Sequence, residues 1–219
     1  MAGASIWTES AFASTNPEEQ SRVRELKAGS EEAFDWLIAQ YGPPVYRLAH
    51  RILHDPADAA DAVQDVFLKV FRNIGQFHGE SSLKTWIYRI TVNTASNQMR
   101  WWRRHKERES PLEAPECWKR ETLGDPADSS QNPFESLLSR ENQEIVWKAL
   151  GRLAEGSRTV LVLREMENLS YEEIGEILHL SLGTVKSRMA RARCALKREV
   201  ESIMGSAPVS LPVWNTAEE

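Results

Sequence analysis

Residues 169–193 read LSYEEIGEILHLSLGTVKSRMARAR, and this stretch decides the fold. Ser170 and Glu173 have the spacing of a capping box, in which each side chain satisfies a backbone N–H at the start of a helix. Apolar residues then recur at three- and four-residue intervals, which is the period of an α-helix. A short turn at residues 179–181 leads into a second helix, which Ser181 or Thr184 caps. Two short helices joined by a tight turn predict a helix-turn-helix.

Charge separates these two helices. The first contains Glu172, Glu173 and Glu176 and no lysine or arginine, whereas residues 184–198 contain six basic residues and no acid. The six are Lys186, Arg188, Arg191, Arg193, Lys197 and Arg198. A solvated basic face on a helical bundle is the alternative, but six like charges on one helix repel one another unless a polyanion is present. Only the second helix is therefore expected to lie against DNA.

The position of each residue on this second helix predicts its role. The N-terminal half of a recognition helix usually reaches the base edges in the major groove. We expect Lys186, Ser187 and Arg191 to read bases. The expected phosphate contacts are Thr184, Arg188, Arg193 and Lys197.

A second basic cluster ends a helical stretch that begins at Leu83. Residues 100–108 hold five basic residues against only Glu107, and Trp101 and Trp102 lie among them. Aromatic rings beside arginines suit unpaired bases, which stack on the rings while the arginines bind phosphates. The alternative is a helix end whose tryptophans simply pack on their own domain.

An acidic stripe precedes this cluster on another predicted helix. Asp58, Asp61 and Asp65 recur at three- and four-residue spacing, beside Gln64 and the bulky Phe67. The stripe is either a plain solvated surface or a docking site for a basic protein, and charge alone favours the first interpretation.

The whole chain predicts an all-α protein with two small helical domains joined by a flexible acidic linker. Its 219 residues suit two small domains, and no period-two alternation requires a sheet. The Gly42-Pro43-Pro44 segment is expected to break one helix into two.

Residues 109–137 contain seven acidic and two basic residues, a net charge of −5, which equals that of the whole chain. A linker of this length means that the two domains need not touch. The expected divisions are a tail at 1–20, a first domain at 21–108, the linker at 109–137, a second domain at 138–204 and a tail at 205–219.

Other functional classes have little support. No apolar run reaches the roughly 18 residues of a membrane span and no signal-peptide pattern is present, so no membrane insertion and a cytoplasmic location are expected. Cys117 and Cys194 match no metal-ligand spacing and are expected to be reduced thiols. His50 and His54 are four residues apart, but no third and fourth ligand accompanies them. No metal, no cofactor and no catalytic residues are therefore predicted.

Several ordered motifs resemble those of one family. They are DAVQDVFLK at 61–69, FHGES at 77–81, TWIYRITVN at 85–93, LSYEEI at 169–174 and GTVKSR at 183–188. Together they resemble bacterial RNA polymerase sigma factors of the extracytoplasmic-function group, over about residues 22–204. Two positions differ: Lys186 stands where the family often has arginine, and His179 occupies a turn position where small residues are commoner.

The resemblance implies a sigma factor, not an enzyme, that directs core RNA polymerase to promoter DNA. The first domain resembles region 2, and Asp58, Asp61, Gln64, Asp65 and Phe67 would dock on the coiled coil of the largest subunit. The −10 element would be bound by Phe77, Ser81, Trp86, Asn93, Asn97, Arg100, Arg103 and Arg104. The second domain resembles region 4, which reads the −35 element and contacts the polymerase flap, while the linker would thread a channel built for RNA. The resemblance further implies a stress response under the control of an anti-sigma factor. A conventional helix-turn-helix repressor or activator is the rival hypothesis, and dependence on core polymerase separates the two.

Overall fold

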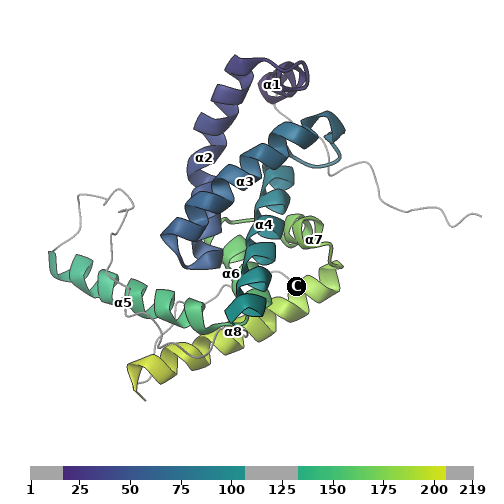
Figure 1. Ribbon diagram of the computed structural model, residues 1–219. Coiled ribbons are helices and arrows are strands. Elements are labelled where there is room, and N and C mark those ends of the chain that lie inside the picture. Colours follow the sequence, from purple (N-terminus) through teal and green to yellow (C-terminus); the bar gives the residue numbers. More distant parts are fainter. Residues whose placement is uncertain (1–16, 107–132, 206–219) are drawn as a thin grey trace, which may run out of the picture.

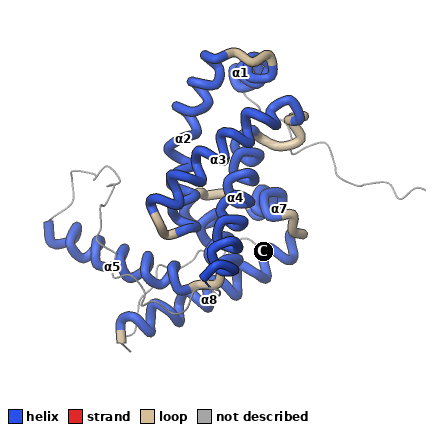
Figure 2. Tube along the Cα trace, viewed as in Figure 1, coloured by secondary structure: helices blue, strands red, loops and turns tan. Residues whose placement is uncertain are grey.

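The computed structural model describes residues 17–106 and 133–205, and within these ranges every regular element is helical (Figures 1 and 2). The predicted all-α class is confirmed. No helix within the described ranges is long and apolar enough to cross a membrane. Most of the predicted tails and linker lies outside the described residues, as does Cys117.

The first half consists of four helices. They are α1 (Pro17–Lys27), α2 (Glu31–Leu53), α3 (Pro56–Asn73) and α4 (Leu83–Lys106), with a 3₁₀ turn, η1 (Ile74–Gln76), after α3. Ser30 caps α2, and its Oγ accepts a hydrogen bond from the Ala33 N–H at 3.3 Å. The Asp55 carboxylate caps α3 by accepting from the N–H groups of Ala57 and Asp58. A buried apolar cluster that draws on all four helices holds the half together.

The expected break at Gly42-Pro43-Pro44 was wrong, because α2 continues through both prolines. A proline removes a backbone N–H and leaves the carbonyl four residues earlier without its helical partner. Here those carbonyls belong to Ala39 and Gln40, which are both exposed, so water can satisfy them. Leu37 and Val45, on either side, are fully buried and hold the two parts in line.

The second half contains α5 (Pro133–Arg152), α6 (Glu155–Leu161), α7 (Tyr171–Leu178) and α8 (Leu182–Met204). A π-helical turn, η2 (Val162–Met166), follows α6 directly. The first turn of α5 lies inside the predicted 109–137 linker. Figure 1 shows α5 and α8 as two long helices that lie together below α2–α4, and Leu150 of α5 and Leu196 of α8 share one buried cluster.

The two halves are in contact, although the predicted linker is long enough for them to stay apart. Tyr88 and Val92 of α4 share a buried cluster with Leu169, just before α7, and with Ile174 and Ile177 of α7. Figure 1 shows α7 beside α4, and α4 and α7 are in contact. The acidic linker therefore connects two parts that also pack directly on each other.

Candidate nucleic-acid interface

The first helix of the helix-turn-helix, α7, begins with the predicted capping box. The Ser170 Oγ accepts from the Glu173 N–H at 3.1 Å, and the Glu173 carboxylate accepts from the Ser170 N–H at 2.8 Å. These two bonds satisfy backbone donors that a helix start otherwise leaves unpaired. The start of α7 is thus fixed locally by its own sequence.

The turn between α7 and α8 depends on a glycine. His179 ends α7 in a left-handed conformation with a φ of 53°, and the Leu180 N–H donates to the Gly175 carbonyl at 2.9 Å. A Cβ atom on Gly175 would lie 2.9 Å from the Leu180 carbonyl oxygen. Only glycine therefore allows this close approach. The turn sets the direction in which α8 leaves.

Of the two residues predicted to cap α8, Ser181 and Thr184, the structure shows Ser181 as the cap. Its Oγ accepts from the Thr184 N–H at 3.3 Å, and the two hydroxyl oxygens lie 2.9 Å apart. Ser187 and Arg191 also bond to the helix itself: the Ser187 hydroxyl donates to the Thr184 carbonyl, and the Arg191 Nε donates to the Ser187 carbonyl. Backbone carbonyls of α8 thus bind two of the three side chains that are predicted to read bases.

The three predicted base-reading residues lie on the outer side of α8. Lys186, Ser187 and Arg191 are all exposed, while Val185 and Met189 are buried. An exposed basic surface with an apolar inner side is the arrangement by which a recognition helix enters a major groove.

Arg193 differs from the other predicted phosphate contacts. Its side chain is half-buried, and its guanidinium lies 2.7 Å from the carboxylate of Glu165 in η2. Arg188 and Lys197 are exposed, and Lys197 has only a loose 3.9 Å contact with Glu201. Glu165 lies 28 residues before Arg193 in the sequence. The charge pattern of α8 alone therefore could not reveal this ion pair.

The predicted −10 residues fall into two groups, of which the first is largely internal. Phe77 is only 6% exposed, and its ring packs on the half-buried Trp86 with centroids 5.4 Å apart. The Ser82 Oγ accepts from the Thr85 N–H at 3.0 Å and so caps α4, a role that the sequence prediction missed. Ser81 is half-buried in the loop before it. This group shapes the loop and the start of α4.

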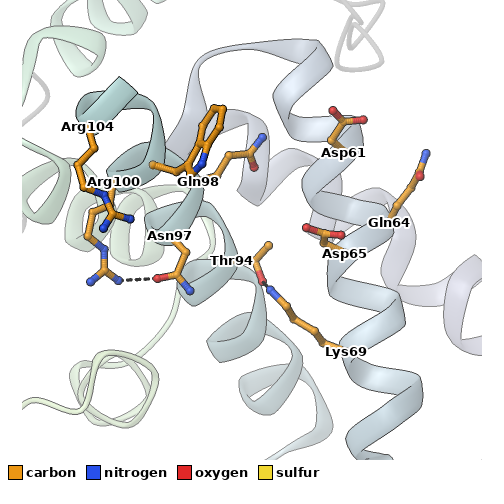
Figure 3. A pocket seen from close by; sticks show the side chains of 10 residues that line it. Asp61, Gln64, Asp65, Lys69, Thr94, Asn97, Gln98, Arg100 and Arg104 are labelled. Atoms are coloured by element: carbon orange, nitrogen blue, oxygen red, sulfur yellow. Dashed lines mark hydrogen bonds between the residues drawn. The ribbon is translucent and has the colours of Figure 1, made fainter. Parts of the chain in front are cut away.

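The second group lies on the exposed part of α4. Asn93 and Asn97 are both exposed, and Arg100 donates to the Asn97 side-chain oxygen at 2.8 Å (Figure 3). The Asn97 side-chain oxygen is thus already bonded, and its amide nitrogen is the remaining donor group of this side chain. Trp101 is 46% exposed and stacks on His105 with ring centroids 3.9 Å apart. Arg103 and Arg104 also belong to α4. Amide, aromatic and guanidinium groups on one helix can hold a single strand.

An open cleft of about 1040 Å³ joins the acidic stripe to this surface. Figure 3 shows Asp61, Gln64 and Asp65 on α3 opposite Asn97, Gln98, Arg100 and Arg104 on α4. Lys69 donates to the Thr94 hydroxyl at 2.9 Å and bridges the two helices inside the cleft. The surface predicted to dock on a protein and the surface predicted to bind DNA are thus two walls of one cleft.

Asp58 and Phe67 are less accessible than the rest of the stripe. Both side chains are half-buried, and Phe67 packs against the core of the first half. Burial, and then the charges of Asp55 and Asp61, raise the pKa of Asp58, although hydrogen bonds from Trp102 and Gln98 oppose this shift. Asp58 is therefore engaged with α4.

His50 and His54 meet an aromatic ring. Trp147 of α5 stacks on His50 with ring centroids 5.1 Å apart, and its ring packs at a tilt against that of His54 at 4.3 Å. Burial, and then the charges of Arg158 and His50, lower the pKa of His54 to about 3. Within the described ranges, no group of three or more potential metal ligands occurs. The histidine pair belongs to the contact between the two halves.

Comparison with known proteins identifies both halves. Sigma-70 region 2 matches residues 37–108, and Sigma-70, region 4, matches residues 143–196. The RNA polymerase sigma-H factor of Pseudomonas aeruginosa is 34% identical over 195 residues, which cover 88% of this chain and 99% of the relative. The ECF RNA polymerase sigma-E factor of Escherichia coli K12 is 36% identical over 186 residues, covering 85% and 96%.

A solved structure shares the fold. The sigma factor RpoE of Bartonella quintana, in complex with the anti-sigma factor NepR, superposes with a TM-score of 0.59 at 24% identity, covering 77% of this chain and 96% of that one. Two matched regions in this order, and relatives matched almost from end to end, show that the chain belongs to the sigma-70 family of RNA polymerase sigma factors, in its extracytoplasmic-function group.

Proposed function

We propose that this chain binds core RNA polymerase in the cytoplasm and directs it to promoters that carry −10 and −35 elements, without catalysing a reaction itself. Family membership supports this function. The observation that carries it is the presence of two exposed surfaces of different chemistry. Lys186 and Arg191 on α8 suit a duplex groove, whereas Asn97 and Trp101 on α4 suit unpaired bases. A conventional repressor needs only the first surface.

Polymerase docking is assigned to the exposed part of the acidic stripe. Asp61, Gln64 and Asp65 are exposed on α3 and line the open cleft, so they are available to a basic coiled coil of the largest subunit. Asp58 and Phe67, being half-buried, are expected to support this surface more than to touch the partner. The second half is proposed to contact the polymerase flap.

Control by an anti-sigma factor is the second part of the proposal. The Bartonella quintana relative was solved in complex with an anti-sigma factor. Such a protein would prevent this chain from binding polymerase until a stress signal releases it. An anti-sigma protein that binds this chain, added to a reconstituted transcription reaction, should abolish the transcription starts that depend on the chain.

Transcription in vitro tests the main proposal. Core polymerase is incubated with a library of genomic fragments, with and without the purified chain, and the start sites are mapped. We expect starts that appear only with the chain and that share paired upstream motifs. DNA binding without core polymerase, and without new starts, would instead favour the conventional regulator.

Matched variants test the docking surface. Asp61→Asn with Asp65→Asn should weaken binding to core polymerase about tenfold or more, because two charge contacts are lost. Asp35→Asn is the control, since Asp35 is also an exposed acid but lies on α2 outside the cleft lining. Equal effects of the two changes would count against the assigned surface.

A further inference from the structure

An exposed aromatic cluster lies at the end of α4. Trp101 is 46% exposed and Trp102 is 42% exposed, whereas the other tryptophans within the described ranges are half-buried. Contact of two such large rings with water is unfavourable. Single exposed apolar side chains are normal on a protein surface, but groups of them mark sites of interaction. The two adjacent tryptophans are therefore candidates for ligand binding.

Neighbouring rings hold Trp101 in place. The His105 ring stacks on the Trp101 ring, with centroids 3.9 Å apart and an angle of 26° between the planes. The His105 Nδ1 donates to the Trp101 carbonyl oxygen at 2.9 Å, which fixes the histidine ring on the helix. Trp102 packs against Trp101 at nearly a right angle, with centroids 5.0 Å apart. Trp101 is thus oriented before a ligand binds, which lowers the entropy that binding must remove.

Asp58 holds the second tryptophan. The half-buried Asp58 carboxylate accepts a hydrogen bond from the Trp102 side chain. Asp58 lies in the first turn of α3, where its N–H donates to the capping carboxylate of Asp55 at 2.9 Å. The Gln98 side-chain nitrogen also donates to the Asp58 carbonyl, at 3.4 Å. The start of α3 thereby fixes the end of α4.

The surroundings of Trp101 suit a nucleotide. Trp101 lines the open cleft together with Arg100 and Arg104, which are both exposed. These three residues and Asn97 recur at three- and four-residue spacing, so they share one side of α4. A base that stacks on the Trp101 ring leaves its phosphate within reach of a guanidinium. Aromatic rings combined with positive charge are the means by which proteins bind single strands.

The opposite wall of the cleft restricts how a ligand can lie. Asp61 and Asp65 on α3 are exposed and lie opposite Arg100 and Arg104 (Figure 3). Carboxylates repel phosphates, so a nucleic-acid backbone is expected on the α4 side of the cleft. In a duplex the bases stack on one another and offer no free ring face to Trp101, whereas a single strand does. The cleft therefore favours unpaired DNA.

We infer that Trp101 is a stacking platform for one unpaired base of promoter DNA, and that Asp58 and Trp102 hold this platform in position. Arg100 and Arg104 bind the phosphates beside that base. The inference rests on the proposed function. It makes Asp58 a positioning residue for DNA binding and not a contact of the polymerase.

The platform adds a subsite to those predicted from the sequence motifs. Trp101 lies about 6 Å beyond Asn97 along α4, at about 1.5 Å per residue. Stacking uses the ring face, which every base has, so the subsite tolerates any base. It is thus expected to raise the affinity for unpaired DNA without changing the sequence that the chain prefers.

Two single-stranded probes isolate the contribution of stacking. One is an oligothymidylate of about 12 nucleotides, and the other is an oligonucleotide of the same length whose sugars carry no bases. Both have the same phosphates, so the ratio of their dissociation constants for the full-length chain measures what the bases contribute. In anisotropy titrations at one salt concentration, we expect the oligothymidylate to bind about fivefold more tightly or better. Equal affinity of the unsubstituted chain for the two probes overturns the platform.

Substitutions of Trp101 test the platform directly. Trp101→Ala should weaken the binding of oligothymidylate about fivefold or more and leave the binding of the abasic probe unchanged. Trp101→Phe keeps a ring and should retain most of the affinity. Arg104→Gln is the contrasting variant, because the loss of a phosphate contact should weaken the binding of both probes alike. If Trp101→Ala weakens both probes equally, or neither, the platform is overturned.

A conservative pair of variants tests the positioning role of Asp58. Asp58→Asn keeps an oxygen that can accept the hydrogen bond from Trp102, whereas Asp58→Ala has no acceptor. The alanine variant should lower the preference for oligothymidylate about threefold, and the asparagine variant should retain it. Glu199→Gln is the control for the loss of one negative charge, because Glu199 pairs with Arg152 in the second half at 3.8 Å. If Asp58→Ala keeps the full preference, as Glu199→Gln should, the positioning role is overturned.

Transcription in vitro separates this inference from the proposed function. Starts that depend on the chain should need a higher concentration of Trp101→Ala than of the unsubstituted chain. If oligothymidylate binding depends on Trp101 but no starts appear with core polymerase, the platform is supported and the proposed function is contradicted. If starts appear and Trp101→Ala changes neither the starts nor the preference between the probes, the proposed function stands and the platform is overturned.

Discussion

At the scale of single residues, His54 is expected to make the fold sensitive to acid. Its pKa is lowered to about 3, chiefly by burial, whereas an unfolded chain has a histidine pKa of about 6.5. Below pH 6.5 the unfolded chain takes up a proton that the folded chain refuses. Neutral His54 thus makes its full contribution to the stability of the folded chain above pH 6.5, and this contribution is lost as the pH falls toward 3. Between pH 7 and pH 5.5 we expect this residue to lower the free energy of unfolding by about 1 kcal/mol.

Denaturant titrations at the two pH values measure this effect. In His54→Asn the residue cannot take up a proton, and asparagine tolerates the left-handed φ of 61° at this position. His179→Asn is a close control, because His179 also has a left-handed φ, of 53°, but is exposed. The pH dependence should shrink in the first variant only. An unchanged dependence in His54→Asn would rule out this source of acid sensitivity.

Two arginines on α8 should differ in their effect on DNA binding. Arg191 is exposed and bonds only weakly to its own helix at 3.2 Å, whereas Arg193 is paired with Glu165 at 2.7 Å. Arg191→Ala should weaken binding to a −35 duplex by about 1–3 kcal/mol. Arg193→Ala should mainly lower thermal stability. Anisotropy titrations with labelled duplex and melting curves separate the two effects, and equal losses of affinity would contradict the structural role of Arg193.

At the scale of elements, the turn of the helix-turn-helix predicts opposite effects for two glycines. A methyl group on Gly175 would lie 2.9 Å from the Leu180 carbonyl oxygen, whereas one on Gly183 would meet nothing within 4 Å. Gly175→Ala should therefore destabilise the protein by about 1–3 kcal/mol. Gly183→Ala should be neutral or stabilise it by up to about 1 kcal/mol. Thermal denaturation of both variants checks this, and a harmless Gly175→Ala would mean that α7 and α8 can move apart easily.

Structural features that are set by residues close together in the sequence could be predicted. The Ser170–Glu173 capping box follows from four consecutive residues, and the sequence predicted it correctly. Pro43 and Pro44 misled the prediction, because the packing of Leu37 and Val45 on distant helices decides whether α2 continues. The local sequence shows that a proline removes a helical hydrogen bond. Only the tertiary fold shows that the packing on either side keeps the helix continuous despite this loss.

At the scale of the whole molecule, the contact between the halves had no signal in the sequence. Tyr88 and Leu169 have the spacing of ordinary core residues, and periodicity does not say which helix they face. Glu167 resembles a surface acid until Arg51 is found beside it, more than a hundred residues earlier in the chain. The surfaces predicted for DNA and polymerase could be named from motifs, whereas their mutual placement requires the structure.

This contact predicts that the halves stay together when the linker is cut. A protease site inserted between residues 115 and 126 allows cleavage of the folded chain. A tether supplies an effective concentration on the order of millimolar, so a contact that depended on the tether would separate after cleavage. Because the interface buries Tyr88 and Leu169 and satisfies the Glu167 carboxylate, we expect the fragments to co-elute at micromolar concentration. Glu167→Gln should favour separate elution and Glu199→Gln should not, whereas separation of the unsubstituted fragments would show that tethering, not the interface, keeps the chain closed.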